Sequence, residues 1–551
     1  LLLAPLLLGM SSEPKGAPVA VTLRLDRPGP AISPLIFGVN FPKDAHRTDA
    51  RVALERWGGN RWTRFDWRTG NDAAGHDWFF ANGGQNAASP DDCWYHAALE
   101  RNRKLGIETI VTLPTIGWVA KDNHSASFPV SKYGPQKRVE ANHPDWGNGE
   151  TPDGKPLTAD PAEAGKPAPP AYIGEFVKYL REKHGPAGDA PRRHYALDNE
   201  PGLWNSNHRD VHPEPLTYDE AWKRTVDYAN AVKDADSTAL VWGPVEWGWI
   251  GIKYSAADKG PKSFADAPDS KQHKAKYFLE WYIQQLAAYK KKTGRLLVDV
   301  IDIHDYPEIY VQDEGRIVMG NKGWNGGDSP RTQRARLDAV RTWWEPGYRP
   351  GGEGVSTWID EPEFLLRRVQ GWIKDHLPEL KLAVTEWNFG GNNSFNGTLV
   401  HALIFQTLMQ EGAYAAAEWG PPGPEQPSFH AYRLFRNYDG KGGSFSGVYV
   451  PAESGSPLLT VFGALDESGR MLRLAVVNTD PANALTARVA VGRAAAGRIR
   501  TFRLAQDAPS VIRAGTLKAP ATAVAGGDSP EARPLEVPAP ASSLTLVEYP
   551  L

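Results

Sequence analysis

Two glutamates stand directly after short apolar runs, a pattern typical of catalytic carboxylates. Glu200 ends residues 195–200 (YALDNE), and Glu386 ends residues 383–386 (AVTE). Cleavage of a glycosidic bond needs two carboxyl groups, one that protonates the leaving oxygen and one that supports the oxocarbenium-like centre. Either glutamate alone is better explained as a solvated loop residue. The pair, with Asn199 beside one and Trp387 beside the other, favours catalysis.

Three polar residues near these glutamates are candidates for contacts with a sugar. The amide of Asn199 could hold a sugar 2-hydroxyl, a contact that strengthens in the transition state. His304 and Tyr306 follow another β-rich run and could reach the nucleophile or a sugar. A hydrogen-bonded structural imidazole is an equally good interpretation of His304.

The sequence is rich in large aromatic residues, with 20 Trp and 19 Tyr. The apolar faces of pyranose rings stack on flat side chains, and Trp and Tyr add a polar group to such a surface. Many of the tryptophans lie in loops rich in Gly and Asn, which favours sugar binding over a large aromatic core. The candidate stacking residues are Trp67, Trp78, Trp324, Trp387 and Trp419. The alternative is packing beneath the rim of the fold.

Eight β-rich runs alternate with longer helical or loop segments up to about residue 418. The predicted strands are residues 35–40, 61–65, 108–113, 194–197, 239–242, 298–304, 382–385 and 414–418. Predicted helices include residues 216–233, 271–291, 363–376 and 399–411. This alternation predicts a TIM-like (β/α)8 barrel, whose chemistry lies at the C-terminal ends of the strands. Glu200 and Glu386 follow the fourth and seventh strands.

The sequence changes character after about residue 426 and predicts an all-β module. Short strands are expected at residues 458–462, 471–477, 486–491, 498–504 and 544–548, without a helical period. Residues 507–540 are rich in Ala, Pro and Gly and are expected to form a loop. These patterns predict a β-sandwich at 426–551. The barrel is expected at 35–425, and a strand region at 19–34 is expected to join the sandwich.

Composition limits the partners that we expect. The formal net charge is −3, so neither nucleic acid nor an anionic membrane is an expected partner. A single cysteine, Cys93, excludes a disulfide within the chain and a zinc site of the Cys-cluster type, and we expect a buried structural thiol. No cofactor is required for the expected chemistry. Asp66, Asp72 and Asp77 could hold a structural calcium ion, although no EF-hand spacing supports it. We expect a monomer.

The first ten residues, LLLAPLLLGM, are mostly apolar. They are too few to span a bilayer but are typical of the apolar core of a signal peptide. A linker rich in Pro, Gly and Ala follows at residues 11–19, so residues 1–18 are expected to be a remnant leader and linker. We expect a secreted or periplasmic protein; an artefact of the gene start is the alternative.

Two segments resemble the catalytic segments of glycoside hydrolase family 44. Residues 195–213 (YALDNEPGLWNSNHRDVHP) are similar to the acid/base segment, and residues 384–391 (VTEWNFGG) are similar to the nucleophile segment. Further matches lie at 58–61, 299–308 and 432–440, and the resemblance extends from about residue 19 to the C-terminus. The family often has Tyr where Trp387 stands.

This resemblance implies a TIM-like barrel with a β-sandwich and retaining chemistry, with Glu200 as general acid/base and Glu386 as nucleophile. It also implies endo action on β-1,4-glucans, including xyloglucan. Retention requires carboxyl groups about 5–5.5 Å apart, against about 6.5–9.5 Å for inversion. Residues 68–82 and 320–344 are expected to form the walls of an open cleft, with stacking platforms at Trp78, Trp324, Trp343 and Trp344.

Other functions remain open at this point because a fold does not determine a substrate. A β-mannanase or xylanase could use the same scaffold. A non-catalytic polysaccharide-binding protein with an inactive barrel, or a structural cell-surface module, would represent a different class. The presence of both glutamates argues against an inactive barrel.

Overall fold

The computed structural model describes residues 16–260, 263–312, 314–317, 329–349, 354–355, 361–520 and 533–551. The chain forms two compact units. The barrel unit comprises Ser33–Gly391 and Thr407–Pro424, and the sandwich unit comprises the residues up to Ile32, Asn392–Gln406 and Glu425–Leu551. The segment Asn392–Gln406, expected within the barrel, is therefore assigned to the sandwich unit.

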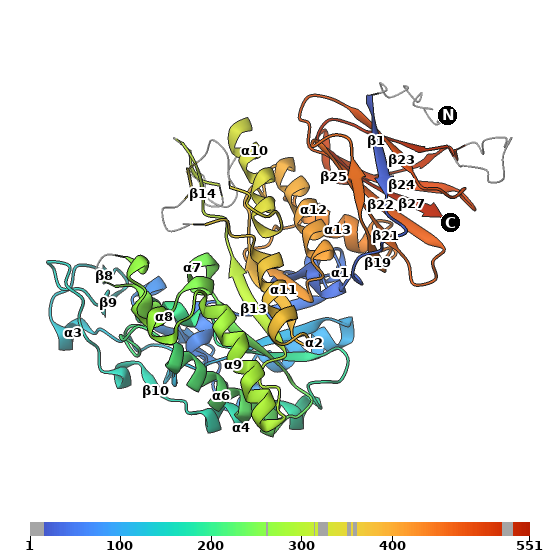
Figure 1. Cartoon of the computed structure of the whole chain (residues 1–551). Coiled ribbons are helices and arrows are strands. Elements are labelled where there is room, and N and C mark those ends of the chain that lie inside the picture. Colours follow the sequence, from blue (N-terminus) through green and yellow to red (C-terminus); the bar gives the residue numbers. More distant parts are fainter. Residues whose placement is uncertain are drawn as a thin grey trace, which may run out of the picture. The chain divides into compact units, whose positions relative to one another are not determined.

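Eight parallel strands close into a barrel in the order β11-β12-β13-β17-β18-β2-β3-β6. Their bounds are β2 (Gly38–Asn40), β3 (Leu54–Trp57), β6 (Glu108–Leu113), β11 (Arg193–Leu197), β12 (Leu240–Glu246), β13 (Val300–Asp305), β17 (Lys381–Trp387) and β18 (Ala415–Glu418). Strand β13 of this barrel is labelled in Figure 1. Side chains such as Leu54, Ile110, Ala196, Val300 and Ala383 form a buried apolar cluster of these strands. The predicted (β/α)8 barrel is confirmed.

The prediction of the second strand was wrong. Residues 61–65 lie in and just after the 3-10 helix η2 (Asn60–Arg64), and the strand is β3, which precedes it. All four residues of β3 are buried, although two of them are charged. Buried charges are tolerated when they are paired, and here Glu55 accepts hydrogen bonds from Arg47 and Arg101. The charged residues hid this strand from an interpretation based on apolar runs.

Helices follow most barrel strands. The described α-helices up to β18 are α1 (Asp44–Thr48), α2 (Tyr95–Leu105), α3 (Val130–Tyr133), α4 (Pro170–His184), α5 (Trp204–Asn207), α6 (Tyr218–Ala235), α7 (Gly248–Lys253), α8 (Pro268–His273), α9 (Phe278–Thr293), α10 (Pro330–Ala339), α11 (Leu365–His376) and α12 (Phe395–Gln410). The expected helix at 271–291 is interrupted between α8 and α9. Lys274, which ends α8, has a φ of 53°, and this left-handed conformation breaks the helix.

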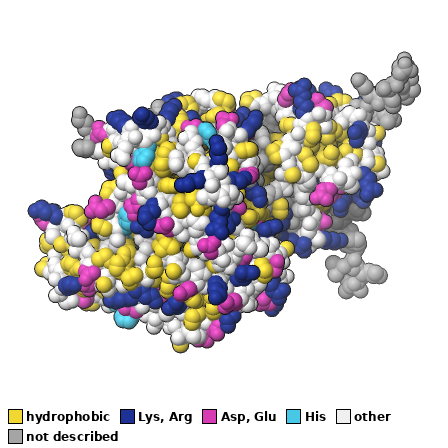
Figure 2. All heavy atoms as spheres, turned by 60° about the horizontal axis from the view of Figure 1, so that its bottom comes forward, with side chains coloured by type: hydrophobic (Ala, Val, Ile, Leu, Met, Phe, Trp, Pro, Cys, Tyr) yellow, Lys and Arg dark blue, Asp and Glu magenta, His cyan; other side chains and the backbone are white. Residues whose placement is uncertain are grey.

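Short antiparallel sheets decorate the barrel unit. They are β4 (Asn71–Ala73) with β5 (Asn82–Gly84), β7 (Trp118–Ala120) with β10 (Gly165–Pro167), β8 (Val139–Glu140) with β9 (His143–Gly147), and β14 (Ile309–Val311) with β15 (Gly315–Arg316) and β16 (Gly354–Val355). On the face drawn in Figure 2, acidic and basic side chains are interspersed. Within the described residues, no helix combines the length and apolarity needed to cross a membrane.

The sandwich unit contains two main sheets. One has the order β20-β1-β23-β26 and the other the order β19-β21-β22-β27-β24-β25. The strands are β1 (Ala17–Leu23), β19 (Val448–Val450), β20 (Ala452–Ser454), β21 (Leu459–Leu465), β22 (Met471–Asn478), β23 (Leu485–Ala490), β24 (Ile499–Ala505), β25 (Ala508–Leu517), β26 (Leu535–Ala539) and β27 (Ser543–Pro550). The N-terminal strand β1 pairs with β20 and β23, so the start of the described chain completes this unit.

Two predictions for the C-terminal part were wrong. The expected loop at 507–540 contains β25 and β26. Strand β25 lies at the edge of its sheet and is largely exposed, so it needs no apolar alternation. The part expected to be all-β contains the helix α13 (Phe429–Asn437). Phe429, Tyr432 and Phe435 are buried on this helix at a spacing of three, which is a helical signal that the strand-rich context obscured.

Candidate active site

The two predicted glutamates meet at the C-terminal end of the barrel. Glu200 lies three residues after the end of β11, and Glu386 is the second-last residue of β17. One carboxylate oxygen of each, together with a ring nitrogen of His304, lie within 4.8 Å of one another. This separation is far below the range of about 6.5–9.5 Å that an inverting mechanism needs to admit a water molecule. The geometry is therefore that of a retaining pair.

Two hydrogen-bond donors fix the carboxyl group of Glu386. Arg56 donates through Nη1 to Oε1 at 2.7 Å, and the hydroxyl of Tyr306 donates to Oε2 at 2.8 Å. The Glu386 side chain is 6% exposed, and that of Arg56 is fully buried. Burial and the charges of both glutamates hold the pKa of Tyr306 well above its usual range, so it remains a donor. A carboxylate side chain that is fixed in this way is suited to nucleophilic attack.

Glu200 has a different environment. Its Oε1 lies 2.9 Å from Nδ1 of His304, and its side chain is 14% exposed. Burial raises the pKa of Glu200 to about 7, with a further increase from the charge of Asp77 that opposes the effect of Arg56. A carboxyl group that keeps its proton near neutral pH can donate it and later accept one. The surroundings thus give Glu200 the raised pKa of a proton donor and give Glu386 two hydrogen-bond donors.

Asn199 is fixed by its neighbours. Its Oδ1 accepts from Nη2 of Arg56 at 2.8 Å and from the backbone N–H of Gly59 at 3.0 Å. Because both bonds use Oδ1, the amide orientation is set and Nδ2 is the side that can donate. This is the arrangement that the predicted contact with a sugar 2-hydroxyl requires.

Arg56 is the central residue that the sequence analysis missed. It connects Glu386 with Asn199 and also donates to Oδ1 of Asn40 at 3.1 Å. A Cβ atom at Gly58 would lie 2.3 Å from the guanidinium carbon, so the glycine makes room for the arginine. The available signal was an arginine inside a short strand, two residues before Gly58, but the sequence analysis did not recognise that strand.

The aromatic candidates fall into two groups, and the first group, whose side chains are at least partly accessible, comprises Trp78 and Trp419. Trp78 ends η3 (Gly75–Trp78) and is 50% exposed. Trp419 follows β18 and is half-buried; its ring lies against Gly59, where a Cβ atom would be only 2.4 Å away. Since Gly59 also binds Asn199, Trp419 lies at the catalytic end of the barrel. Both residues remain candidate sugar platforms.

The second group is buried and corrects the predictions. Trp67 is 6% exposed and stacks on Phe176, with ring centroids 5.4 Å apart. Trp387 is completely buried. Trp343 is also buried and donates to Asp305, so it cannot act as a cleft platform. Rings whose faces are covered by the chain itself have no face to offer a sugar. Trp324 lies outside the described residues.

The acidic side chains considered for calcium each have a partner of their own. Asp66 pairs with Lys166 at 2.6 Å, and Asp72 pairs with Arg61 at 2.5 Å. Asp77 accepts from Asn60 at 2.9 Å. A calcium ion in this loop stays a prediction.

Cys93 is buried, as expected. Its Sγ lies 3.6 Å from the carbonyl oxygen of Trp67, and burial raises the pKa of the thiol to about 11. A thiol that keeps its proton at neutral pH is a poor nucleophile. The residue is therefore structural.

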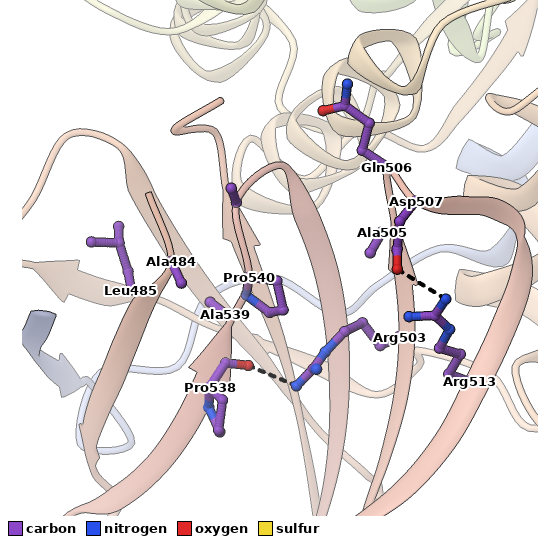
Figure 3. Close-up of a pocket in the computed structure, with 11 residues that line it drawn as sticks. Ala484, Leu485, Arg503, Ala505, Gln506, Asp507, Arg513, Pro538, Ala539 and Pro540 are labelled. Atoms are coloured by element: carbon purple, nitrogen blue, oxygen red, sulfur yellow. Dashed lines mark hydrogen bonds and ion pairs between the residues drawn. The ribbon is translucent and has the colours of Figure 1, made fainter. Parts of the chain in front are cut away.

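The sandwich unit contains a separate pocket of about 500 Å³ (Figure 3). Arg503 crosses it to donate to the carbonyl oxygen of Pro538 at 2.8 Å, and Arg513 pairs with Asp507 at 3.0 Å. Mostly Ala and Pro line the remainder, and among the described residues that line it there is neither an aromatic ring nor a pair of carboxyl groups. It offers no chemistry of the kind seen at the end of the barrel.

Comparisons with known proteins agree with this geometry. Residues 71–309 match the model of glycoside hydrolase family 44. Endoglucanase A of Paenibacillus lautus is 32% identical over 488 residues, which are 85% of this chain and 65% of that protein. Beta-mannanase/endoglucanase A of Caldicellulosiruptor saccharolyticus is 30% identical over 457 residues, which are 79% of this chain and 32% of that protein.

A solved structure extends the likeness to both units. CelM2, a bifunctional glucanase-xylanase from a metagenome library, is 29% identical with a TM-score of 0.86, covering 97% of this chain and 99% of that chain. The likeness therefore includes the barrel and the sandwich, and the resemblance noted in the sequence is confirmed. Over residues 71–309 the chain matches glycoside hydrolase family 44.

Proposed function

We propose that the protein is a retaining, endo-acting β-1,4-glucan hydrolase in which Glu200 is the general acid/base and Glu386 the nucleophile. The observation that carries the proposal is the contrast within one pair of carboxyl groups. Their oxygens lie within 4.8 Å, yet Glu386 receives hydrogen bonds from Arg56 and Tyr306 while burial raises the pKa of Glu200 to about 7. Retaining hydrolysis needs one ionised and one protonated carboxyl group at this spacing.

In the first half of the reaction, Glu386 attacks the anomeric carbon and Glu200 protonates the leaving oxygen. The Glu386 carboxylate stabilises the developing charge at the sugar, and Nδ2 of Asn199 donates to the sugar 2-hydroxyl. In the second half, Glu200 takes a proton from water, which releases the sugar from Glu386 with the original configuration. Arg56 and Tyr306 hold Glu386 in position for both steps.

Azide rescue tests these roles. Glu386→Ala should abolish hydrolysis, and azide should restore it as the α-glycosyl azide, because attack comes from the emptied face. Glu200→Ala with an activated aryl glycoside should give the β-glycosyl azide, because Glu386 still forms the covalent intermediate. Glu246→Gln is the control. This third carboxyl group ends β12 and is only 2% exposed, so azide cannot take its place. Azide should therefore leave the turnover rate of Glu246→Gln unchanged. An α-azide from Glu200→Ala would reverse the two roles.

The substrate class is supported by the names of the relatives. One is named an endoglucanase, one a beta-mannanase/endoglucanase and one a glucanase-xylanase. These names favour a β-1,4-linked polysaccharide with an equatorial backbone, and glucan and xyloglucan are our first choice. The exposed ring of Trp78 is a platform that an extended chain could reach. We further propose that the protein acts outside the cytoplasm, since such polymers do not enter cells.

A panel of polysaccharides separates the alternatives. On xyloglucan or carboxymethylcellulose, viscosity should fall faster than reducing ends appear, because an endo-enzyme cuts within the chain. Release of glucose or cellobiose alone from chain ends would contradict endo action. Activity confined to mannan or to xylan would instead favour a mannanase or a xylanase. No turnover on any of these polymers would favour a non-catalytic binding protein.

A further inference from the structure

A line of buried polar groups leads from Glu200 into the barrel. Nδ1 of His304 lies 2.9 Å from Glu200, and Nε2 of the same ring lies 3.3 Å from Oγ1 of Thr385. Oγ1 of Thr385 in turn lies 2.8 and 2.9 Å from the two carboxylate oxygens of Asp302. His304, Thr385 and Asp302 are all completely buried. Thus a second carboxyl group is connected to Glu200 by an unbroken path of hydrogen bonds.

The protons along this path of hydrogen bonds can be placed in two ways. If Asp302 is ionised, Thr385 donates to it and Nε2–H of His304 donates to Thr385. Nδ1 is then a bare acceptor and the proton lies on Glu200. If Asp302 is protonated, every bond reverses, and Nδ1–H of His304 donates to an ionised Glu200. Both arrangements hold the same number of protons and leave the imidazole neutral.

The surroundings of the path allow this exchange. Burial lowers the pKa of His304 to about 3, so the ring is neutral in either arrangement. Burial also raises the pKa of Asp302 to about 7, the value reached by Glu200. Each end of the hydrogen-bonded path thus has a carboxyl group whose pKa is raised by burial, and two such linked groups can share one proton.

Other charged groups face both ends of the path. Arg56 lowers the pKa of both carboxyl groups, and Glu386 raises that of Asp302. Asp77 raises the pKa of Glu200. Burial and the charge of Glu200 raise the pKa of Glu246. The hydroxyl of Tyr306 donates to Glu386.

We propose that Asp302, Thr385 and His304 form a buried proton relay through which Asp302 and Glu200 share one proton. Transfer moves the proton of Glu200 to Nδ1, the Nε2 proton to Oγ1 of Thr385, and the hydroxyl proton of Thr385 to Asp302. Three bonds to hydrogen break, three form, and one negative charge moves from Asp302 to Glu200. No external acid or base takes part. Asp302 and Thr385 are positioning residues that set the protonation of the acid/base, so the inference rests on the proposed role of Glu200.

The pH dependence of kcat/KM tests the relay. In the wild type, activity should fall as pH rises through about 7, where Glu200 loses its proton. Asp302→Asn removes the negative charge that favours a proton on Glu200, so this basic limb should move to lower pH by about half a unit or more. Thr385→Val should act in the same direction, because Asp302 loses its donor and stays protonated. Thr385→Ser keeps the hydroxyl and is the matched control, with the wild-type limb.

A purely structural role would lower kcat or the melting temperature without moving the limb. The relay is overturned if Asp302→Asn and Thr385→Val hydrolyse substrate with the wild-type limb, or if Thr385→Ser shifts it as far as Thr385→Val. If Asp302→Asn does not fold, the two Thr385 variants still decide. Nitrogen-15 NMR of His304, assigned by its loss in His304→Asn, gives a readout that is independent of turnover. A neutral ring from pH 5 to 8 is expected, and an imidazolium in that range overturns the relay.

Failure of the relay is distinguishable from failure of the proposed function. Azide rescue of Glu200→Ala to the β-glycosyl azide would establish the acid/base whatever the pH profiles of Asp302 and Thr385 variants. Undiminished hydrolysis by Glu200→Ala would remove the proposed function itself.

Discussion

Replacement of Arg56 by lysine isolates what the planar guanidinium does for catalysis. Arg56 reaches Glu386 at 2.7 Å through Nη1 and Asn199 at 2.8 Å through Nη2. An ammonium group keeps the charge but cannot make both contacts from one fixed fork. Loss of one hydrogen bond to a charged group costs about 1.5–3 kcal/mol. Since about 1.4 kcal/mol corresponds to a factor of ten, kcat/KM should fall about 10- to 150-fold.

Arg56→Ala should be worse. It leaves the nearly buried carboxylate of Glu386 without a cation, and breaking such a pair costs about 3–5 kcal/mol. This corresponds to a loss of about 150- to 5,000-fold in kcat/KM. Initial rates on a soluble β-glucan, with the melting temperature of each variant measured in parallel, separate catalytic loss from unfolding.

Arg64→Lys is the matched control for this experiment. Arg64 is also fully buried and donates to a carboxylate at 2.9 Å, but this carboxylate belongs to Asp210 and not to a catalytic glutamate. Its conversion should lower the melting temperature while leaving kcat/KM of the folded protein within about threefold of the wild type. The reasoning is refuted if folded Arg56→Lys retains wild-type kcat/KM. It is equally refuted if both lysine variants lose the same activity at the same melting temperature.

Three further predictions concern single groups around the site. Asp77→Asn should move the basic limb of kcat/KM to lower pH, because the charge of Asp77 raises the pKa of Glu200. The comparison is Asp72→Asn, since the Asp72 carboxylate pairs with an arginine. An equal shift of the limb in both variants would contradict the assignment. Trp78→Ala should raise KM about 2- to 12-fold with an unchanged melting temperature, because an exposed ring contributes about 0.5–1.5 kcal/mol of stacking; an unchanged KM would remove it as a platform. Cys93 should resist iodoacetamide at pH 8 in the native protein and react after unfolding, because burial raises the pKa of the thiol to about 11; labelling of the native protein would contradict this.

The catalytic pair could be predicted from the sequence because each glutamate belongs to a short pattern of neighbouring residues. An apolar strand followed by a carboxylate is a short-range pattern, and seven of the eight predicted strands overlap a strand of the barrel. The alternation of strands and helices then orders the strands around the barrel. Glu200 and Glu386 could thus be assigned to one end of the fold without any knowledge of their contacts.

The groups that distinguish the two glutamates could not be predicted in this way. The contact of Arg56 with Glu386 joins positions 330 residues apart, and that of Thr385 with Asp302 joins positions 83 apart. Exposure was similarly out of reach: Trp78 and Trp343 both lie in loops or short helices with polar neighbours, yet one is half exposed and the other completely buried. Burial of a ring depends on what the rest of the chain packs against it, which periodicity does not encode.

The missed strand shows where physical chemistry and sequence pattern diverge most. An interpretation by apolar runs rejects β3 because it contains Glu55 and Arg56, although all of it is buried. Burying a charge destabilises the fold unless the charge is paired, so a strand with such residues is stable only where hydrogen-bond or ion-pair partners lie beside it. For Arg56 those partners are Asn199 and Glu386, the residues around which the chemistry turns. The feature that hid the strand is therefore the one that marks it as functional: a charge that costs stability in the core is retained where it holds a reacting group in place.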